Sequence, residues 1–383
     1  MDKAEVLGRI TKRTALEYVK KKVAPEAAAK IRELNLPGIG VVEDNVRFYP
    51  NGTLAAHVLG FTGIDSQGLE GIEYSRDEEL TGRHGSILTE YGADGIKIPG
   101  AEHEFIPPIQ GNTVKLTIDK NIQAFAEREL AKLMAGQGVN MEGVVPKSAS
   151  ILVMEPSTGR MLAIASAPTF DPNNYQASDP STRRCVAIQN GYEPGSTFKI
   201  ITLAAAFEEK KVSLNDTFTD PGFATILGKR IRCWKAGGHG TQTTVEIAEN
   251  SCNPGFIELG QRLGMDKFYK YLLDFGFGRK TGIEMSGEAK GILADKKKAT
   301  ALDLATMSIG QTNNVTPIQL ITAVSAVANG GVLLQPQLVQ EIISPDGEVL
   351  VPFEKKVVRR VISESTSKTV REILESVVTN GTG

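Results

Sequence analysis

The first 37 residues carry apolar side chains at helical spacing. These positions are Leu7, Ile10, Leu16, Val19 and Val23. Pro25 then opens a second helical segment, which Pro37 and Gly38 end. From residue 38 to 110 the pattern changes to short apolar runs broken by Gly, Pro and Asn, which predicts an irregular and mostly β region.

Further along, the chain predicts a strand, a helix and a hairpin. Residues 113–118 read as a strand, and Asp119 is placed to cap a helix after it. The helix face that we expect to be buried carries Ile122, Phe125, Ala126, Leu130 and Leu133. Apolar runs over 149–154 and 160–166 flank a turn with Pro156 and Gly159, which is typical of a β-hairpin.

Beyond the hairpin, the pattern is mainly helical as far as about residue 330. Strand-like runs return over 331–362, and a last helix is predicted over Glu364–Val378. A hairpin followed by many helices and then by more strands is typical of an α+β fold rather than of a repeated βαβ fold.

The composition is that of a folded protein with two or three domains. Of 383 residues, 41% are apolar and 23% are charged. The 43 Lys and Arg residues nearly balance the 45 Asp and Glu residues, which argues against a nucleic-acid binder. Three cysteines exclude a disulfide scaffold, and the longest apolar run, around Ile200–Phe207, is far shorter than the about 20 residues that cross a bilayer.

The strongest chemical signal is Ser196, followed three residues later by Lys199. Pro194 and Gly195 break the preceding segment and an apolar helix begins, so Ser196 lies at or near a helix N-terminus with Lys199 on the same face. The helix start offers free N–H groups to a developing oxyanion, and a desolvated Lys has a lowered pKa and accepts a serine proton. The alternative is a helix-capping Ser with a solvated Lys one turn later.

A second signal is Ser251-Cys252-Asn253, which lies between two predicted helices over 244–249 and 256–263. Such a connection puts a hydroxyl and a carboxamide on the same side of a tight turn, although it also fits an ordinary helix stop. Ser-x-x-Lys and Ser-x-Asn in this order, about 55 residues apart, are the signature of the penicillin-binding serine acyltransferases.

Longer motifs carry a resemblance over nearly the whole chain, which is similar to a class B penicillin-binding protein. The matching segments are Arg47–Pro50, Ala55–Gly60, Gly68–Glu73, Leu116–Asp119 with Ile122-Gln123, Met154–Gly159, Phe170–Asn173, Ile309–Gln311, Val315–Leu320 and Ala328–Gly331. Within the family, Cys233-Trp234, Gly238–Gly240 and Ser251–Pro254 most resemble the sporulation-specific, stage V branch of Bacillus and Clostridium.

The resemblance implies an α+β, penicillin-binding/β-lactamase-like transpeptidase domain over 112–383. An irregular, partly β pedestal domain of the dimerisation type would precede it over 1–111. The implied activity is that of a peptidoglycan D,D-transpeptidase, which cross-links stem peptides ending in D-Ala-D-Ala during spore cortex or cell-wall synthesis. It needs no cofactor for its chemistry and is inhibited by β-lactam antibiotics.

The resemblance also assigns roles to the two motifs. Ser196 would be the nucleophile, with its backbone N–H as half of the oxyanion hole, and Lys199 would be its base. Ser251 would relay a proton to the leaving amine, and Asn253 would hold the peptide amide. The expected partners are a glycosyltransferase of the shape-elongation-division-sporulation type and no nucleic acid, and the expected location is the extracytoplasmic face of the cell membrane.

The family's third motif is Lys-Thr-Gly or Lys-Ser-Gly. The triplet Lys280-Thr281-Gly282 lies only 27 residues past Asn253, in a context that resembles a surface loop, so we expect it to be exposed and away from Ser196. In relatives the motif follows the segment that ends here at Asn380–Gly383. We therefore expect the transpeptidase domain to be truncated before this motif, and the pedestal to be truncated after a membrane helix. The 149–166 hairpin would then keep an open apolar edge.

Two other classes of function fit parts of the sequence. A β-lactamase or D,D-carboxypeptidase of the same superfamily shares the serine nucleophile, but a β-lactamase usually needs a Glu base, for which no motif is present. A non-catalytic fragment that acts as a scaffold is the other alternative. Labelling by a fluorescent penicillin separates the three.

Cys233, His239 and Cys252 suggest a metal site. Cys233 and His239 bracket a Gly-rich turn, Cys252 lies within the second motif, and Asp220 is a candidate fourth ligand. Two thiolates and an imidazole suit a structural Zn²⁺, and some clostridial relatives of the sporulation type carry zinc beside the active serine. The spacing itself is not a Cys-x-x-Cys pattern. A Cys233–Cys252 disulfide and unpaired thiols are the alternatives.

Overall fold

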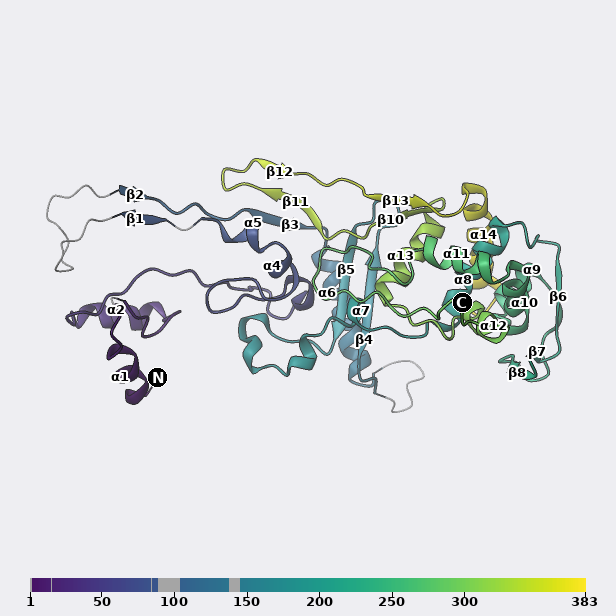
Figure 1. Ribbon diagram of the computed structural model, residues 1–383, viewed down its shortest axis with the longest axis horizontal. Coiled ribbons are helices and arrows are strands. Elements are labelled where there is room, and N and C mark those ends of the chain that lie inside the picture. The colour runs from purple at the N-terminus through teal and green to yellow at the C-terminus, as the bar shows by residue number, and fades with distance from the viewer. Residues whose placement is uncertain (1, 15, 84, 89–103, 138–144) are drawn as a thin grey trace.

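The computed structural model describes residues 2–14, 16–83, 85–88, 104–137 and 145–383. The chain is elongated, with an N-terminal pedestal at one end and a larger, mainly helical body at the other (Figure 1). Within the described ranges, no helix combines the length and the apolar character that crossing a membrane requires.

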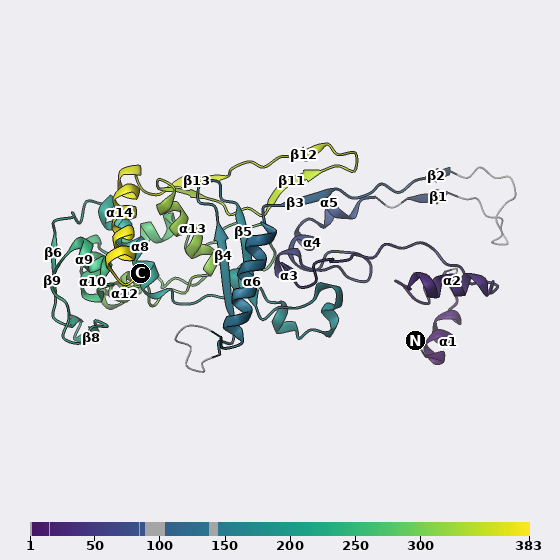
Figure 2. The same cartoon turned by 180° about the vertical axis from the view of Figure 1, so that it is seen from behind.

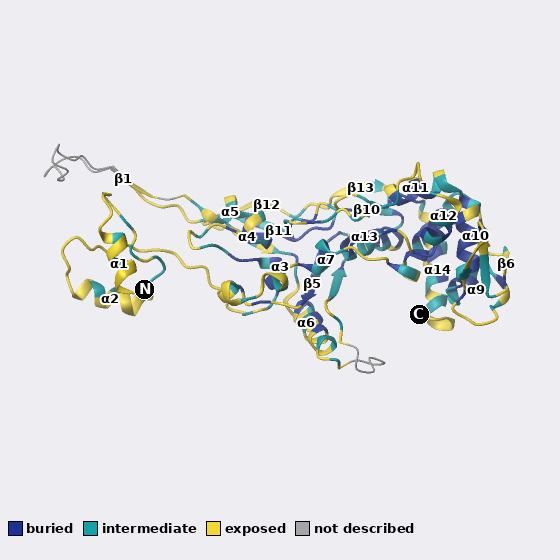
Figure 3. Cartoon of the chain, turned by 60° about the horizontal axis from the view of Figure 1, so that its bottom comes forward, coloured by how far each residue is buried: buried dark blue, intermediate teal, exposed yellow. Residues whose placement is uncertain are grey.

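The pedestal is built from short elements. They are α1 (Lys3–Ile10), α2 (Pro25–Glu33), α3 (Ala56–Leu59), α4 (Gly71–Ser75), α5 (Asp77–Thr81), β1 (Ser86–Leu88) and β2 (Glu104–Ile106). Helix α2 confirms the second predicted helical segment, but α1 ends at Ile10, so the helical prediction is wrong at Leu16, Val19 and Val23. The exposure of both helices is evident in Figure 3. The prediction of a mostly β region over 38–110 is wrong where the structure describes it. Gly60 permits the helical packing there, because a Cβ on it would lie 1.8 Å from the Glu70 carbonyl oxygen.

A helix on a hairpin forms the middle of the molecule (Figures 1 and 2). Strands β4 (Ala149–Met154) and β5 (Met161–Ala167) pair as predicted, and α6 (Lys120–Met134) packs on them. Asp119 caps α6, with Oδ1 accepting hydrogen bonds from the Asn121 and Ile122 N–H groups at 2.8 and 3.0 Å. Among the described residues β4 pairs with β5 alone, so its other edge has no strand partner, as expected. The outer edge of β5 is not open, because the Met161 N–H donates to the Gln337 carbonyl at 3.0 Å and the Leu162 carbonyl accepts the Asp119 N–H at 2.9 Å.

The predicted apolar face of α6 is wrong at Phe125, which is 55% exposed. Gln123 is buried in its place. Its side-chain amide donates to the Ile164 carbonyl at 2.9 Å and accepts from the Ile164 N–H at 2.8 Å, so it pairs with β5 as a strand would. A polar side chain is buried here without penalty because both of its groups are hydrogen-bonded.

The predicted strands near the C-terminal end are confirmed. Strands β3 (Thr113–Leu116), β11 (Val339–Ile343) and β12 (Val349–Val351) form one sheet in the order β12-β11-β3, and β10 (Val332–Leu334) pairs with β13 (Val357–Arg360). Helix α14 (Glu364–Asn380) follows and packs on the body. The Glu284 carboxylate joins this region to the pedestal: it accepts from the Leu338 and Val339 N–H groups and from the Arg76 guanidinium, at 2.7, 2.8 and 3.1 Å.

The helical body surrounds α8 (Lys199–Glu208), whose residues 201–206 are all buried. The other members are η3 (Gly195–Phe198), α9 (Thr244–Glu249), α10 (Asn253–Leu263), α11 (Met265–Asp274), α12 (Ala301–Ser308) and α13 (Pro317–Ala328). Outside this body, η1 (Pro172–Ala177) and η2 (Pro180–Arg183) lie against the pedestal, where the Tyr175 ring stacks on Phe61, and α7 (Val186–Gln189) packs on β4 and β5. The mainly helical prediction is wrong over 217–243. That segment forms β6 (Thr217–Asp220), β7 (Phe223–Ile226), β8 (Lys229–Arg232) and β9 (Gly240–Thr243), which pair as β6–β9 and β7–β8.

Candidate active site

Ser196 and Lys199 lie at the start of the buried helix α8. Ser196 is in the 3₁₀ turn η3, and its carbonyl accepts the Lys199 backbone N–H. Ser196 is exposed, whereas the Lys199 side chain enters the interior and is only 4% exposed. The turn is hydrogen-bonded to the segment after α12, because the Gly195 N–H donates to the Gly310 carbonyl at 2.9 Å. Gly310 must lack a side chain, since a Cβ there would lie 2.0 Å from the Gly195 carbonyl oxygen.

The second motif forms a tight connection between two helices. Helix α9 starts at a capping box made by Thr243 and Glu246, and α10 starts at Asn253 directly after Cys252. Ser251 takes the left-handed conformation, with φ at +46°. This conformation costs an L-residue roughly 1–2 kcal/mol, so the surrounding contacts must hold it in place.

Lys199 supplies those contacts. Its Nζ donates to the Ser251 carbonyl at 2.7 Å, to the Ser251 Oγ at 3.1 Å and to the Asn253 Oδ1 at 2.7 Å. Nζ also lies 5.3 Å from the centre of the buried Phe256 ring. The structure therefore brings together three of the four predicted catalytic residues.

Burial lowers the pKa of Lys199 to about 8, because the interior disfavours its charged form. An ammonium donates to all three oxygens. A neutral amine has only two protons, which fit the two carbonyl-type oxygens at 2.7 Å, and its lone pair then faces a hydroxyl. The same three oxygen atoms can therefore form hydrogen bonds with either the charged or the neutral form of the Lys199 amine.

Ser196 is not hydrogen-bonded to Lys199 in this structure. No hydrogen bond of the described residues uses its Oγ, and none of the backbone bonds outside the regular elements uses its N–H. Catalytic hydrogen bonds are often long in ligand-free structures. The free hydroxyl and the free N–H lie on an exposed turn, where a substrate carbonyl can reach both.

Asp220, Cys233, His239 and Cys252 converge from four segments. Asp220 ends β6, Cys233 follows β8, His239 precedes β9, and Cys252 lies between α9 and α10. One donor atom from each lies within 4.8 Å of the others. The Asp220 Oδ2 lies 2.8 Å from the His239 Nδ1 and 3.4 Å from the Cys252 Sγ, and the Cys233 Sγ lies 3.4 Å from the His239 Nδ1. The predicted trio and its candidate fourth ligand are thus brought together.

The donor set of this cluster fits zinc. Two sulfurs, a ring nitrogen and a carboxylate oxygen match the number and kind of ligands that zinc takes in structural sites. Burial raises the pKa of Cys252 to about 12 and also raises that of Cys233, so neither thiol ionises readily without a cation. Burial acts to raise the pKa of Asp220, but hydrogen bonds from His239, Cys233 and Gly222 lower it to about 2. The structure contains no disulfide: all three cysteines are unpaired.

The segment after β8 braces the second motif, which the sequence analysis did not predict. The Asn253 Nδ2 donates to the Arg232 carbonyl at 3.0 Å, and the Trp234 Nε1 donates to the Asn250 carbonyl at 2.7 Å. These bonds hold both ends of the strained turn at Ser251. The Cys233-Trp234 pair is the only sequence feature related to these hydrogen bonds. It carries the resemblance to the sporulation-specific branch of the family, but it does not by itself predict a contact with the second motif.

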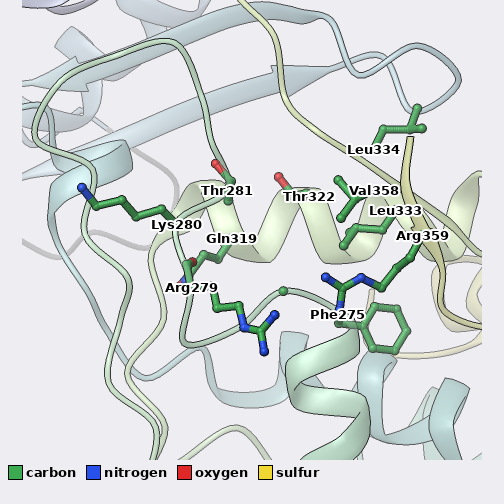
Figure 4. Close-up of a pocket in the computed structure, with 11 residues that line it drawn as sticks. Phe275, Arg279, Lys280, Thr281, Gln319, Thr322, Leu333, Leu334, Val358 and Arg359 are labelled. Carbon is green, nitrogen blue, oxygen red and sulfur yellow. The ribbon is translucent and has the colours of Figure 1, made fainter. Parts of the chain in front are cut away.

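The Lys280–Gly282 triplet has no hydrogen bond to the catalytic residues. Lys280 is exposed in a loop that lines a pocket together with Gln319 and Thr322 of α13, and in Figure 4 its side chain extends away from that helix. The Thr281 N–H and hydroxyl and the Gly282 N–H all bind the buried Glu288 carboxylate. The triplet therefore belongs to a loop that is folded around the Glu288 carboxylate. This is consistent with the expectation of an exposed loop.

Family models match both parts of the chain. The penicillin-binding protein dimerisation domain matches residues 1–116, and the penicillin-binding protein transpeptidase domain matches residues 149–383. The chain belongs to the penicillin-binding protein family.

Curated relatives agree with the family models. Stage V sporulation protein D of Bacillus subtilis is 45% identical over 100% of this chain and 59% of its own length. The peptidoglycan D,D-transpeptidase FtsI of Escherichia coli is 30% identical over 96% of this chain and 58% of its own length. The chain therefore spans about three fifths of the length of these relatives.

Solved structures support the α+β transpeptidase fold with its N-terminal domain. A peptidoglycan synthetase from Bifidobacterium adolescentis matches 99% of this chain and 68% of its own chain, with a TM-score of 0.79 and 29% identity. Penicillin binding protein 3 of Mycobacterium tuberculosis matches 87% of this chain and 69% of its own, with a TM-score of 0.74 and 30% identity.

A substitution in the triplet tests its separation from catalysis. Lys280→Ala in the full-length protein is expected to leave the rate of acylation by a fluorescent penicillin within a few-fold of wild type, because its side chain is exposed and has no hydrogen bond to Lys199, Ser251 or Asn253. Stopped-flow labelling measures this rate. A fall of more than about tenfold, with thermal unfolding unchanged, would show that Lys280 takes part in acylation.

Proposed function

We propose that this protein is a serine acyltransferase, a peptidoglycan D,D-transpeptidase that acts through an acyl-enzyme on Ser196. The observation that carries the proposal is the buried Lys199 amine, which lies one helical turn from an exposed serine and is held by Ser251 and Asn253. A lowered pKa makes this amine a base near neutral pH, which an exposed lysine is not.

In the acylation step, the Ser196 Oγ attacks the carbonyl carbon of the penultimate D-Ala of a stem peptide. The hydroxyl proton passes to the Lys199 Nζ, and the developing oxyanion accepts a hydrogen bond from the Ser196 N–H. The bond to the terminal D-Ala nitrogen then breaks, and the leaving amine takes a proton. The Ser251 Oγ, 3.1 Å from Nζ, is placed to relay that proton from Lys199.

In the second step, an amine of a neighbouring stem peptide attacks the acyl-enzyme. The ester bond to the Ser196 Oγ breaks, a cross-linking amide forms, and the amine proton returns through Lys199 to the serine. Asn253 is proposed to hold the peptide amide. Because its Oδ1 and one N–H already bind Lys199 and the Arg232 carbonyl, it would use its remaining lone pair and N–H for the substrate.

A β-lactamase or carboxypeptidase would pass the acyl group to water, and a scaffold would not react at all. A fluorescent penicillin separates these possibilities in the full-length protein: stable labelling supports the transpeptidase, rapid turnover supports a β-lactamase, and no labelling supports a scaffold.

The proposal includes an extracytoplasmic site of action at the cell membrane, in cortex or wall synthesis, beside a glycosyltransferase that makes the glycan strands. The domain boundary between residues 111 and 112 is part of the same proposal.

Two substitutions test the assigned roles. Ser196→Ala should abolish covalent labelling by penicillin without unfolding the protein, because its side chain is exposed and makes no hydrogen bond in the described structure. Lys199→Ala should slow acylation by about 10²–10⁴-fold, the usual contribution of a general base. Peptide mass mapping of the wild-type adduct is the deciding measurement, and a label on any residue other than Ser196 contradicts the assignment.

We further propose that Asp220, Cys233, His239 and Cys252 hold a structural Zn²⁺. Since Cys252 lies between Ser251 and Asn253, a bound ion would fix the turn that positions Lys199. Zinc can also activate water, but Ser196 already supplies a nucleophile, and the chemistry proposed above needs no metal. Support comes from the convergence of the four donors and from the thiols, which are buried beside a carboxylate.

Metal analysis tests this site. Protein purified without chelator should contain close to one equivalent of zinc, and chelation should lower its melting temperature because metal binding is coupled to folding. Cys233→Ser should remove most of the zinc, whereas Cys185→Ser, which alters a buried thiol outside the cluster, should not. A zinc content below about a tenth of an equivalent in the wild type would exclude the site.

A further inference from the structure

The β7–β8 hairpin carries a concentration of positive charge beside the active site. Lys229, Arg230, Arg232 and Lys235, here called the cationic strip, lie within seven residues, and no acidic residue occurs between Asp220 and Glu246. The whole chain has a net charge of −2, so the strip reverses the sign of charge locally. Figures 1 and 2 place the hairpin at an outer corner of the helical body.

The strand register turns this charge outward. Arg230 and Arg232 pair with Thr225 and Phe223, and they alternate with Ile231, which packs against the core. Cys233, two residues further on, faces inward like Ile231 and is buried in the cluster that it forms with Asp220, His239 and Cys252. Successive side chains of a strand point to opposite faces, so the two arginines share the outer face of the hairpin.

The charges of the strip are not neutralised by the part of the chain that the structure describes. All four side chains are exposed, and none forms an ion pair with any residue that the structure describes. The Arg230 guanidinium lies 4.4 Å from the centre of the Phe223 ring, which fixes its position without cancelling its charge. Unpaired cations of one sign attract an anionic ligand and raise its local concentration.

The strip is joined directly to the catalytic turn. The Arg232 carbonyl accepts the Asn253 side-chain amide, and Trp234 binds the Asn250 carbonyl. Trp234 is nevertheless 61% exposed, so one end of its indole is fixed and much of the ring surface is free. A ligand on the strip would therefore lie next to the residues that hold Lys199.

We infer that the cationic strip, with Trp234, is a binding subsite for the carboxylates of an acidic peptide that delivers its acyl group to Ser196. This inference rests on the proposed function and deepens it: the enzyme would select donor peptides that carry free carboxylates over amidated ones. The observations favour a peptide over an anionic membrane surface, because the strip is connected to the catalytic turn and lies on a short hairpin with only two arginines on its outer face.

Direct binding tests the inference without relying on catalysis. The probe is N-acetylated L-Ala-γ-D-Glu-L-Lys-D-Ala-D-Ala with its lysine side chain also acetylated, compared with the same peptide amidated at the glutamate α-carboxylate. Calorimetric titration of the full-length Ser196→Ala protein gives both dissociation constants. We expect the acidic peptide to bind about three- to tenfold more tightly than the amidated one, and the difference to shrink at 1 M salt, where the Debye length is about 3 Å.

A matched pair of variants locates the effect. Arg230→Gln with Arg232→Gln should abolish the preference for the acidic peptide. Lys210→Gln with Lys211→Gln removes the same charge from exposed positions at the opposite end of α8 and should leave the preference intact. In the protein with Ser196 restored, the arginine pair should raise KM for the acidic peptide and leave kcat close to that of the parent.

The other outcomes contradict either the inference or the proposed function on which it rests. Equal affinity for the two peptides, or a preference that survives the arginine substitutions, shows that the strip does not bind the peptide carboxylate. Strip-dependent binding to vesicles of phosphatidylglycerol without any peptide preference shows a membrane surface instead. If the wild-type protein fails to label with penicillin while the peptide preference is present, the proposed catalysis is wrong and the subsite stands.

Discussion

The burial of one amine is the constraint on which the active site depends. Lys199 is 4% exposed at the start of a helix whose next turns are buried, and its Nζ lies over the ring of Phe256. An ammonium in such surroundings is unfavourable unless oxygen atoms surround it. The turn at Ser251 provides three, and it adopts a left-handed conformation in doing so. The base and the turn therefore stabilise each other, and the same contacts lower the cost of strain and burial.

Several other features act on this turn. Cys252 links the Ser251 turn to the cluster of Asp220, Cys233, His239 and Cys252. Trp234 and the Arg232 carbonyl form hydrogen bonds at the two ends of the turn, and helix α10 begins at Asn253. The cationic strip belongs to the same hairpin that provides this brace. Nucleophile activation, metal binding and substrate selection are thus proposed to meet on one connection between two helices. Loss of the cluster or of the brace is expected to alter the position of Lys199, whereas the outward side chains of the strip are expected to affect binding alone.

The sequence predicted those parts of the structure that depend on local signals. Pro194-Gly195 before an Ala-rich run predicted the start of α8, Asp119 predicted the start of α6, and the turn around Pro156 and Gly159 predicted the hairpin. The four-residue strands over 217–243 were missed because their alternation is too short to distinguish from the surrounding helices. Gln123 was missed because its burial depends on the backbone of Ile164, 41 residues away. The donors of the cluster were predicted by residue type, whereas the brace by Trp234 depends on tertiary contact alone.

The most direct test of this account is the protonation state of Lys199 in the folded protein. Titration of lysine labelled with ¹³C at Cε, followed by NMR and assigned with a Lys199→Arg variant, measures its pKa. Burial favours the neutral amine, so the Lys199 signal should titrate near pH 8, well below the exposed lysines. A Lys199 that stays protonated above pH 10 would contradict the account, because the amine would then be no base for Ser196 at neutral pH.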